Sequence, residues 1–125
     1  MWEEKLFITD AQGAQEGERI LRLNGPVTMA TLFDFRDTMR AEKTARTVIL
    51  DFSEVPYVDS AGVGSLVNAH VSCVNAGRTL VLVAVQERIR ALMKNTRVDE
   101  ILTIYPTLQE AQAAGVTQDD AGISD

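Results

Sequence analysis

The sequence predicts an α/β fold, a small mixed β-sheet with helices packed against it, in the element order β-β-α-β-α-β-α-β-α. Three short apolar runs, at residues 48–52, 79–85 and 102–105, have the aliphatic composition of buried strands. Segments in which apolar residues recur at helical spacing separate these runs. Strands that alternate with helices imply right-handed crossover connections and a partly parallel sheet.

The first part of the chain predicts a hairpin followed by a helix. Strands are expected at residues 5–9 and 19–23, joined by a polar, glycine-containing loop, and they add an antiparallel pair to the sheet. After an Asn-Gly-Pro turn, Thr28 is expected to cap a helix over about residues 29–42. The apolar side of that helix holds Met29, Leu32, Phe33, Arg36 and Met39.

The central part predicts a buried strand, a loop and a long helix. The strand at residues 48–52 is followed by an extended or loop segment at 53–59, because Pro56 disfavours helix for itself and its predecessor. A helix then runs over about residues 60–76 and ends at Gly77, a favourable residue after a helix.

The last part predicts two strands that alternate with two helices. The strand at residues 79–85 is the most apolar, and we expect it in the centre of the sheet. The helix at residues 86–95 is expected to bury Ile89, Leu92 and Met93. A short strand at residues 102–105 precedes a final helix, which Thr107 caps and which runs to about Ala114.

Length and composition predict a single domain. The chain has 125 residues, of which 46% are hydrophobic, and this is enough for one compact core. We assign residues 1–116 to that domain. Residues 117–125 are acidic and poor in large apolar side chains, so we expect a mobile tail.

The charge balance excludes several classes of partner. Twelve basic and 18 acidic residues give a net charge of -6, which disfavours binding to nucleic acids and to anionic membranes. No apolar run reaches the roughly 18 residues of a membrane span. The first five residues do not resemble a signal peptide. The single cysteine, Cys73, cannot form an internal disulfide. These observations predict a cytoplasmic protein.

The sequence does not contain the residues that common catalytic or metal sites need. One histidine and one cysteine cannot form a His/Cys metal cluster. The segment around Ser60 lacks the first glycine of a Gly-x-Ser-x-Gly nucleophile motif. The run from Gly62 to Val67 fails the dinucleotide-binding pattern at its third small position. We therefore expect a binding module without a cofactor or a metal, and not an enzyme.

Asp51 allows two interpretations. It ends a buried strand, and Pro56 follows five residues later, as in a receiver domain with a phosphoacceptor aspartate. A receiver also needs an acidic pair after its first strand and a lysine after a late strand, whereas here Asp10 stands alone and Lys94 lies inside a helix. The simpler interpretation is that Asp51 accepts hydrogen bonds from loop amides.

Ser60 also allows two interpretations. The segment Asp59-Ser60-Ala61-Gly62 opens a helix, where free backbone N–H groups and the positive end of the helix dipole favour negative charge. Ser60 could act as the N-cap, which contributes about 1 kcal/mol. The same place also suits a phosphoserine, because the helix end tolerates the added charge.

The helix that follows Ser60 carries no charged side chain before Gly77. We expect its core side to hold Val63, Leu66, Val67, His70, Val71 and Val74, with His70 in a structural role. The opposite side holds small, uncharged residues: Ala61, Gly64, Ser65, Asn68, Ala69, Ser72, Asn75 and Ala76. A smooth, uncharged face favours docking by another protein. The alternative is that another helix or the tail of this chain covers it.

These residues resemble the signature of the STAS domain, the sulfate transporter and anti-sigma-factor antagonist family. The matching segments are Val48-Ile49-Leu50-Asp51-Phe52-Ser53 and Val58-Asp59-Ser60-Ala61-Gly62-Val63-Gly64. The agreement runs from Leu6 to about Ala114 and includes the Gly77 turn. The departures are Thr28, where many antagonists have an acidic residue, His70 in place of an apolar residue, and Arg97 in place of a frequent glycine.

The resemblance implies a bacterial anti-sigma-factor antagonist, since no transporter or sensor domain is attached to this length of chain. In that family the serine matching Ser60 is phosphorylated by the cognate anti-sigma factor, a serine kinase. Only the unphosphorylated antagonist binds the anti-sigma factor and frees sigma, and a phosphoserine phosphatase is a further partner. On this basis we expect a partner-binding surface that consists of Thr28, Asp59, Ser60, Ala61, Gly62, Gly64, Ser65, Asn68, Ala69 and Ser72.

A second hypothesis uses the same fold without phosphorylation. Small STAS proteins also serve as accessory subunits of lipid transporters or as parts of stress-signalling assemblies. In those roles Ser60 would be a helix cap that contacts a partner.

Overall fold

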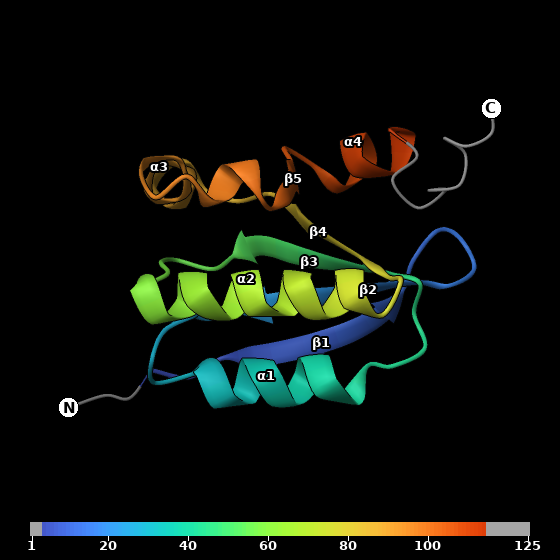
Figure 1. Ribbon diagram of the computed structural model, residues 1–125, viewed down its shortest axis with the longest axis horizontal. Helices are drawn as coiled ribbons and strands as arrows, with labels where there is room; N and C mark the ends of the chain where they lie inside the picture. Colours follow the sequence, from blue (N-terminus) through green and yellow to red (C-terminus); the bar gives the residue numbers. More distant parts are fainter. Residues whose placement is uncertain (1–3, 115–125) are drawn as a thin grey trace.

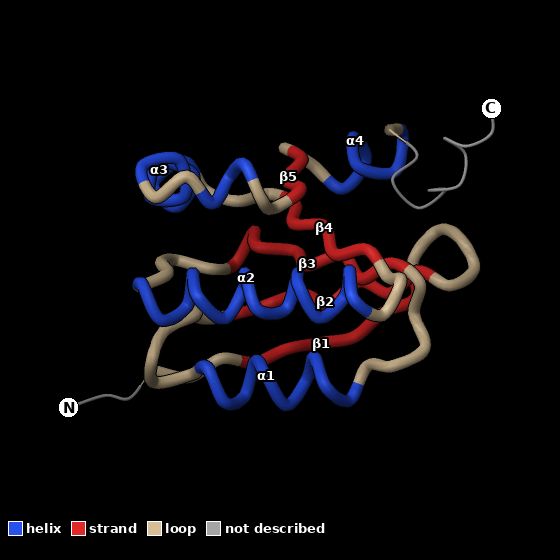
Figure 2. The backbone as a smooth tube through the Cα atoms, in the orientation of Figure 1, coloured by secondary structure: helices blue, strands red, loops and turns tan. Residues whose placement is uncertain are grey.

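The computed structural model describes residues 4–114 and contains one five-stranded mixed sheet (Figure 2). The strands follow one another in space in their sequence order. Only the first pair is antiparallel, and the other three pairs are parallel. This confirms the predicted mixed sheet. The strands are β1 (Phe7–Gln12), β2 (Glu18–Asn24), β3 (Thr47–Glu54), β4 (Thr79–Val83) and β5 (Thr103–Tyr105).

Helices cover both faces of the sheet, as Figure 1 shows. Three of them pack on the face that carries Leu21, Leu50 and Leu82, where the larger core cluster lies. The last helix packs its Ala111 and Leu108 on the opposite face, against Ile49 and Val81. The helices are α1 (Leu32–Ala41), α2 (Ser60–Asn75), α3 (Glu87–Asn95) and α4 (Leu108–Ala113), with a short 3₁₀ turn at Val98–Glu100 before β5.

The centre of the sheet is β3, and the prediction that the strand beginning at Thr79 would be central is wrong. Both β3 and β4 are apolar because helices cover both of their faces. Composition alone therefore could not rank them. The order of the strands decides which of the two is central. The opening hairpin adds two strands on the β3 side, whereas only the three-residue β5 follows β4.

The first helix begins later than predicted. Thr28 is not its N-cap, since α1 starts at Leu32 after Thr31. Val27 forms a parallel bridge with Val58, and residues 29–31 then form a turn in which the Thr31 N–H donates to the Thr28 carbonyl at 3.0 Å. Phe35 enters the core, whereas Met29, which lies in the turn before α1, and Phe33 are each 67% exposed. Their predicted burial is wrong.

The second helix presents a different side to the core than its periodicity indicates. Val71 and Val74 are exposed, and His70 is half-buried. The buried residues are Gly62, Val63, Ser65, Leu66, Ala69 and Cys73. The physical reason is that α2 packs against both the sheet and α1, so small residues face the neighbouring helix. The expectation that Ser65 and Ala69 lie on an exposed face is therefore wrong.

The structure explains one departure from the family pattern, Arg97, and locates another, His70. Arg97 adopts a left-handed conformation with φ 65°, which explains the frequent glycine at this position, because only glycine adopts that conformation without strain. His70 lies on the side of α2 with Val67, which packs against the core cluster.

No helix within residues 4–114 has the length and apolarity needed to cross a membrane. The predicted acidic tail, residues 117–125, lies outside the described residues.

The first turn of α2 approaches the loop after β2 very closely. A Cβ atom at Gly62 would overlap the carbonyl oxygen of Val27 and would lie 2.8 Å from the carbonyl carbon of the same residue. Both obstacles are backbone atoms of a buried residue, so they cannot move aside cheaply. A Cβ at Gly64, by contrast, would meet nothing within 4 Å.

We therefore predict opposite effects for two similar substitutions in one helix. Gly62→Ala should lower the free energy of unfolding by about 3 kcal/mol, because overpacking forces the two segments apart. Gly64→Ala should raise it by about 0.5–1 kcal/mol, because alanine favours helix. Urea unfolding of both variants measures this difference. Equal stabilities for the two variants would contradict the close approach at Gly62.

Candidate functional site

The candidate site consists of two segments that continue β2 and β3 beyond their carboxyl ends. The Gly25 N–H donates to the Glu54 carbonyl at 3.1 Å, and the Val27 N–H donates to the Tyr57 carbonyl at 3.2 Å. The Asp59 N–H donates back to Val27 at 3.3 Å. The two segments therefore run side by side up to the start of α2. The expectation that the segment from Asp51 to Gly64 lies beyond the carboxyl ends of the strands is correct only from Val55 onward, because Asp51 still lies within β3.

Asp59 joins three elements at this point. It is the N-cap of α2, and its Oδ1 accepts a hydrogen bond from the Gly62 N–H at 2.8 Å. Its Oδ2 accepts a second one from the Met29 N–H at 3.1 Å. One carboxylate, on the loop that follows β3, thus joins the first turn of α2 to the segment that leads into α1.

Ser60 is the first residue of α2, and its side chain is exposed. Asp59 performs the capping, so the interpretation of Ser60 as the N-cap is wrong. Within residues 4–114 the Ser60 hydroxyl has no hydrogen-bond partner. The structure thus leaves this hydroxyl accessible at the positive end of a helix of 16 residues.

Large exposed apolar side chains lie on the segments that lead to and from the Asp59 junction, although periodicity assigned two of them to the core. The Met29 N–H donates to Asp59, and Phe33 is the second residue of α1, four positions further along the chain. Tyr57 is 39% exposed and precedes Ser60 by three residues. The sequence did contain an indication of this exposure. Phe33 and Phe35 are two positions apart in one helix, so they cannot both face the core. We call Met29, Phe33 and Tyr57 the apolar rim.

Thr28 is not an exposed contact residue, because it is only 4% accessible. Its hydroxyl donates to the Glu4 carboxylate at 2.7 Å and accepts from the Ala30 N–H at 3.2 Å. The Tyr57 hydroxyl also donates to Glu4. These bonds from Tyr57 and Thr28 lower the pKa of Glu4. Glu4 therefore links the buried Thr28 to Tyr57 of the apolar rim.

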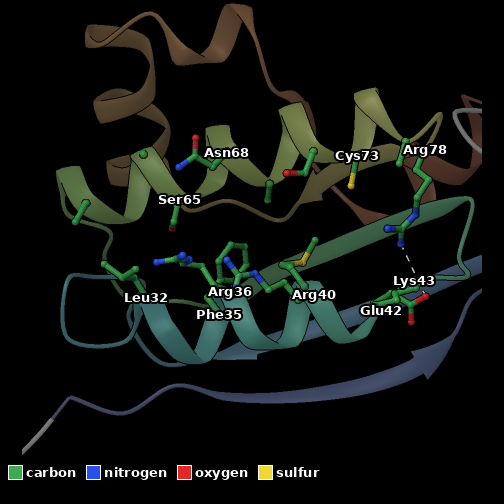
Figure 3. Close-up of a pocket in the computed structure, with 16 residues that line it drawn as sticks. Leu32, Phe35, Arg36, Arg40, Glu42, Lys43, Ser65, Asn68, Cys73 and Arg78 are labelled. Atoms are coloured by element: carbon green, nitrogen blue, oxygen red, sulfur yellow. Dashed lines mark ion pairs between the residues drawn. The ribbon is translucent and has the colours of Figure 1, made fainter.

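The small residues of α2 line a groove between α1 and α2 of about 820 Å³ (Figure 3). Ser65 and Ala69 are its buried residues on α2, while Gly64, Asn68 and Ser72 are exposed. The alternative that another helix covers this side of α2 is thus correct in part, because α1 faces it. The groove begins beside Ala61, the neighbour of Ser60.

Cys73 also lines the groove but is only 3% exposed. Burial raises the pKa of its thiol, although the nearby Arg78 acts in the opposite direction. Because the thiolate is the reactive form, we expect this cysteine to be inert at neutral pH.

Asp51 belongs to a different part of the molecule. Its Oδ1 accepts from the Ser53 N–H at 2.9 Å, and its Oδ2 accepts from the Arg22 Nε–H at 3.0 Å. Burial raises the pKa of this carboxyl, but the hydrogen bonds from Ser53 and Arg22 outweigh that effect and lower it overall. Asp51 thus accepts a backbone N–H, as the simpler interpretation expects, but the donor Ser53 lies within β3 and not in a loop.

Comparison with known proteins identifies the family. The model of the STAS domain matches residues 11–111, which contain both strand segments and the whole of the Asp59 junction. The chain belongs to the STAS family.

Relatives of this STAS domain are named as anti-sigma factor antagonists. A candidate antagonist from Thermotoga neapolitana is 34% identical over 64 residues, which is 51% of this chain and 57% of that protein. The match therefore spans little more than half of the relative's length. The crystal structure of a candidate antagonist from Thermotoga maritima has a TM-score of 0.75 at 23% identity and covers 86% of this chain and 92% of its own.

A further solved structure is that of the antagonist SpoIIAA in its unphosphorylated form. It has a TM-score of 0.64 at 15% identity, and the alignment covers 88% of this chain and 97% of that one. At such identities, the two structures show that the STAS fold is shared.

The role of Asp59 in the STAS domain is testable through stability. Asp59→Ala should lower the free energy of unfolding by about 1–2 kcal/mol, because it removes the helix cap and frees the Met29 N–H. Asp59→Asn keeps one acceptor oxygen and should cost less. Urea unfolding measures both variants. A loss in Asp59→Asn as large as that in Asp59→Ala would mean that hydrogen bonding is not what Asp59 contributes.

The ion pair at Asp51 predicts a pH dependence. The pKa of Asp51 is lowered in the folded protein from its ordinary value of 3.8, so the carboxylate stabilises the fold above that pH. This contribution is lost as the pH falls through the lowered pKa. Asp51→Asn should therefore be less stable than the wild type by about 1 kcal/mol at pH 7. The gap should close as the pH drops well below 3.8. Unfolding curves across this range test it, and a gap independent of pH would contradict the prediction.

Proposed function

We propose that this STAS domain is an anti-sigma-factor antagonist that binds an anti-sigma factor with serine kinase activity and is released when Ser60 is phosphorylated. The observation that carries the proposal is the exposed Ser60 hydroxyl at the start of α2. This hydroxyl does not cap the helix, because Asp59 does so. The antagonists among the relatives support the same role.

The surface around Ser60 fits protein docking. The apolar rim offers three large exposed side chains, of which Met29 and Phe33 are each 67% accessible. Exposed aromatic and methionine side chains are the kind that protein interfaces bury at their centre. No charged residue occurs on α2 itself, so a partner would lose no ion solvation along that helix.

Phosphorylation of Ser60 would oppose such docking by charge and by desolvation. A phosphoryl group adds about -1.5 to -2 charges. It would stand next to the Asp59 carboxylate and beside the apolar rim, where a docked partner excludes water. Moving a complex from mostly bound to mostly free requires about 5.5 kcal/mol, and a buried like-charge contact costs several kcal/mol. One phosphate is therefore of the right magnitude for a switch.

The chemistry of transfer would belong to the partner. The Ser60 oxygen would attack the γ-phosphorus of ATP bound to the kinase, the bond to ADP would break, and the serine proton would pass to a kinase base. A phosphoserine phosphatase would reverse the modification by hydrolysis. We place this cycle in the cytoplasm, where ATP and sigma factors are found.

The first experiment is phosphosite mass spectrometry of the protein isolated from its native cells, with Ser60→Ala as the control. Phosphate on Ser60 that disappears in Ser60→Ala is the expected result. A Ser60 that remains unmodified across growth and stress conditions contradicts the phosphorylation switch. Proteins that co-purify identify the partner. A serine kinase supports the proposal, whereas a transporter ATPase favours the accessory-subunit hypothesis.

The charge mechanism requires a separate measurement on the purified complex. Ser60→Glu should weaken binding to the co-purified kinase at least about tenfold. Thr9→Glu is the matched control, since it adds the same charge at an exposed position of β1, on the sheet face opposite α1 and α2. Isothermal titration measures both. Unchanged affinity of Ser60→Glu, or an equal loss in Thr9→Glu, would contradict local repulsion at Ser60.

A further inference from the structure

The two walls of the groove between α1 and α2 differ in charge. The α2 wall carries no charged side chain along its whole length. The opposite wall carries Arg36 and Arg40 on α1 and Lys43 just after it. Figure 3 shows Arg36 and Arg40 directed from α1 into the space between the helices. This is a local concentration of positive charge in a chain whose net charge is -6.

Within residues 4–114 these three cations have no ion-pair partner. The guanidinium of Arg36 lies over the Phe33 ring, 5.4 Å from its centre. The carboxylate in the groove lining is that of Glu42, which accepts from the Ala45 N–H at 2.8 Å and the Thr44 N–H at 3.1 Å. Glu42 thus holds its own turn and lies 3.9 Å from Arg78.

The spacing of these cations suits a chain of carboxylates. Arg36 and Arg40 are one helical turn apart, which is about 6 Å along the helix axis. Acidic residues one turn apart on a helix, or two apart on an extended chain, have nearly the same spacing. The α2 wall lets such a segment approach closely, because Gly64 has open space around it and Asn68 and Ser72 offer only small polar groups.

We propose that the groove between α1 and α2 binds an acidic segment of the protein that docks at Ser60. This rests on the proposed function for the identity of the partner, and on charge complementarity for the chemistry of the segment. The groove adjoins Ser60 through Ala61, so both would lie within one interface. The acidic segment supplies affinity and orientation, while the state of Ser60 decides whether the complex persists.

A fluorescence anisotropy titration tests the groove directly on the full chain. The probe is a fluorescent glutamate-rich peptide of about 12 residues, which spans about 18 Å as a helix. We expect saturable binding that weakens as the salt concentration rises. A glutamine-rich peptide of the same length should not bind. If it binds equally well, or if the glutamate peptide does not bind at low salt, the inference is wrong.

Two variants locate the binding in the groove. Removing its three cations, in Arg36→Gln/Arg40→Gln/Lys43→Gln, should weaken binding at least about tenfold. The matched control is Arg88→Gln/Arg90→Gln/Lys94→Gln, which removes the same charge from exposed positions of α3. Gly64→Leu fills the groove without changing charge and should also weaken binding. An equal loss in the α3 control, or undiminished binding in Gly64→Leu, would overturn the inference.

Two further measurements separate this inference from its competitors. If Asp119→Asn/Asp120→Asn/Asp125→Asn increases peptide binding, the occupant is this chain's own acidic C-terminal segment, and the partner assignment is wrong. Affinity for the co-purified kinase separates the two proposals. If Ser60→Glu weakens this binding and Arg36→Gln/Arg40→Gln/Lys43→Gln does not, only the proposal for the groove is wrong. The reverse pattern contradicts only the phosphorylation switch.

Discussion

The arrangement of the site depends on one carboxylate, that of Asp59. Its two oxygens accept N–H groups from different segments, Gly62 at 2.8 Å and Met29 at 3.1 Å. This is possible only because Gly62 lets α2 approach the backbone of Val27 more closely than any side chain would permit. The start of α2, the apolar rim and the α1 end of the groove are all positioned by this junction. Because Asp59 caps the helix, the adjacent Ser60 hydroxyl remains available.

The site and the groove form one continuous surface with two kinds of chemistry. At the Ser60 end, the apolar rim provides area that a partner can bury. Along the groove, three cations without ion pairs within residues 4–114 face an uncharged helix. Burial of apolar area is insensitive to charge, whereas the proposed phosphate and the cations would act through electrostatics. Under the proposed function, a partner would therefore be held by apolar burial and released by one added charge.

Much of the fold was accessible from the sequence. The element order, the parallel crossovers and the position of the site beyond the carboxyl ends of the strands all follow from alternating strand and helix patterns. Thr107 was correctly identified as a helix cap, since its hydroxyl accepts from the Glu110 N–H at 3.0 Å. Several of the errors concern orientation. Periodicity placed Phe33 in the core and left Ser65 exposed, and the structure shows the reverse.

The sequence by itself determined the α/β class, the uncharged character of α2 and the Asp-Ser-x-Gly segment at its start, because these are properties of consecutive residues. Only the tertiary structure decided that Asp59 also accepts the Met29 N–H, which apolar side chains are exposed near the Asp59 junction, and that Arg36 and Arg40 face α2. These outcomes involve contacts between distant parts of the chain, such as the Val27–Val58 bridge, which joins residues 31 positions apart. Local spacing carries no information about contacts of this range.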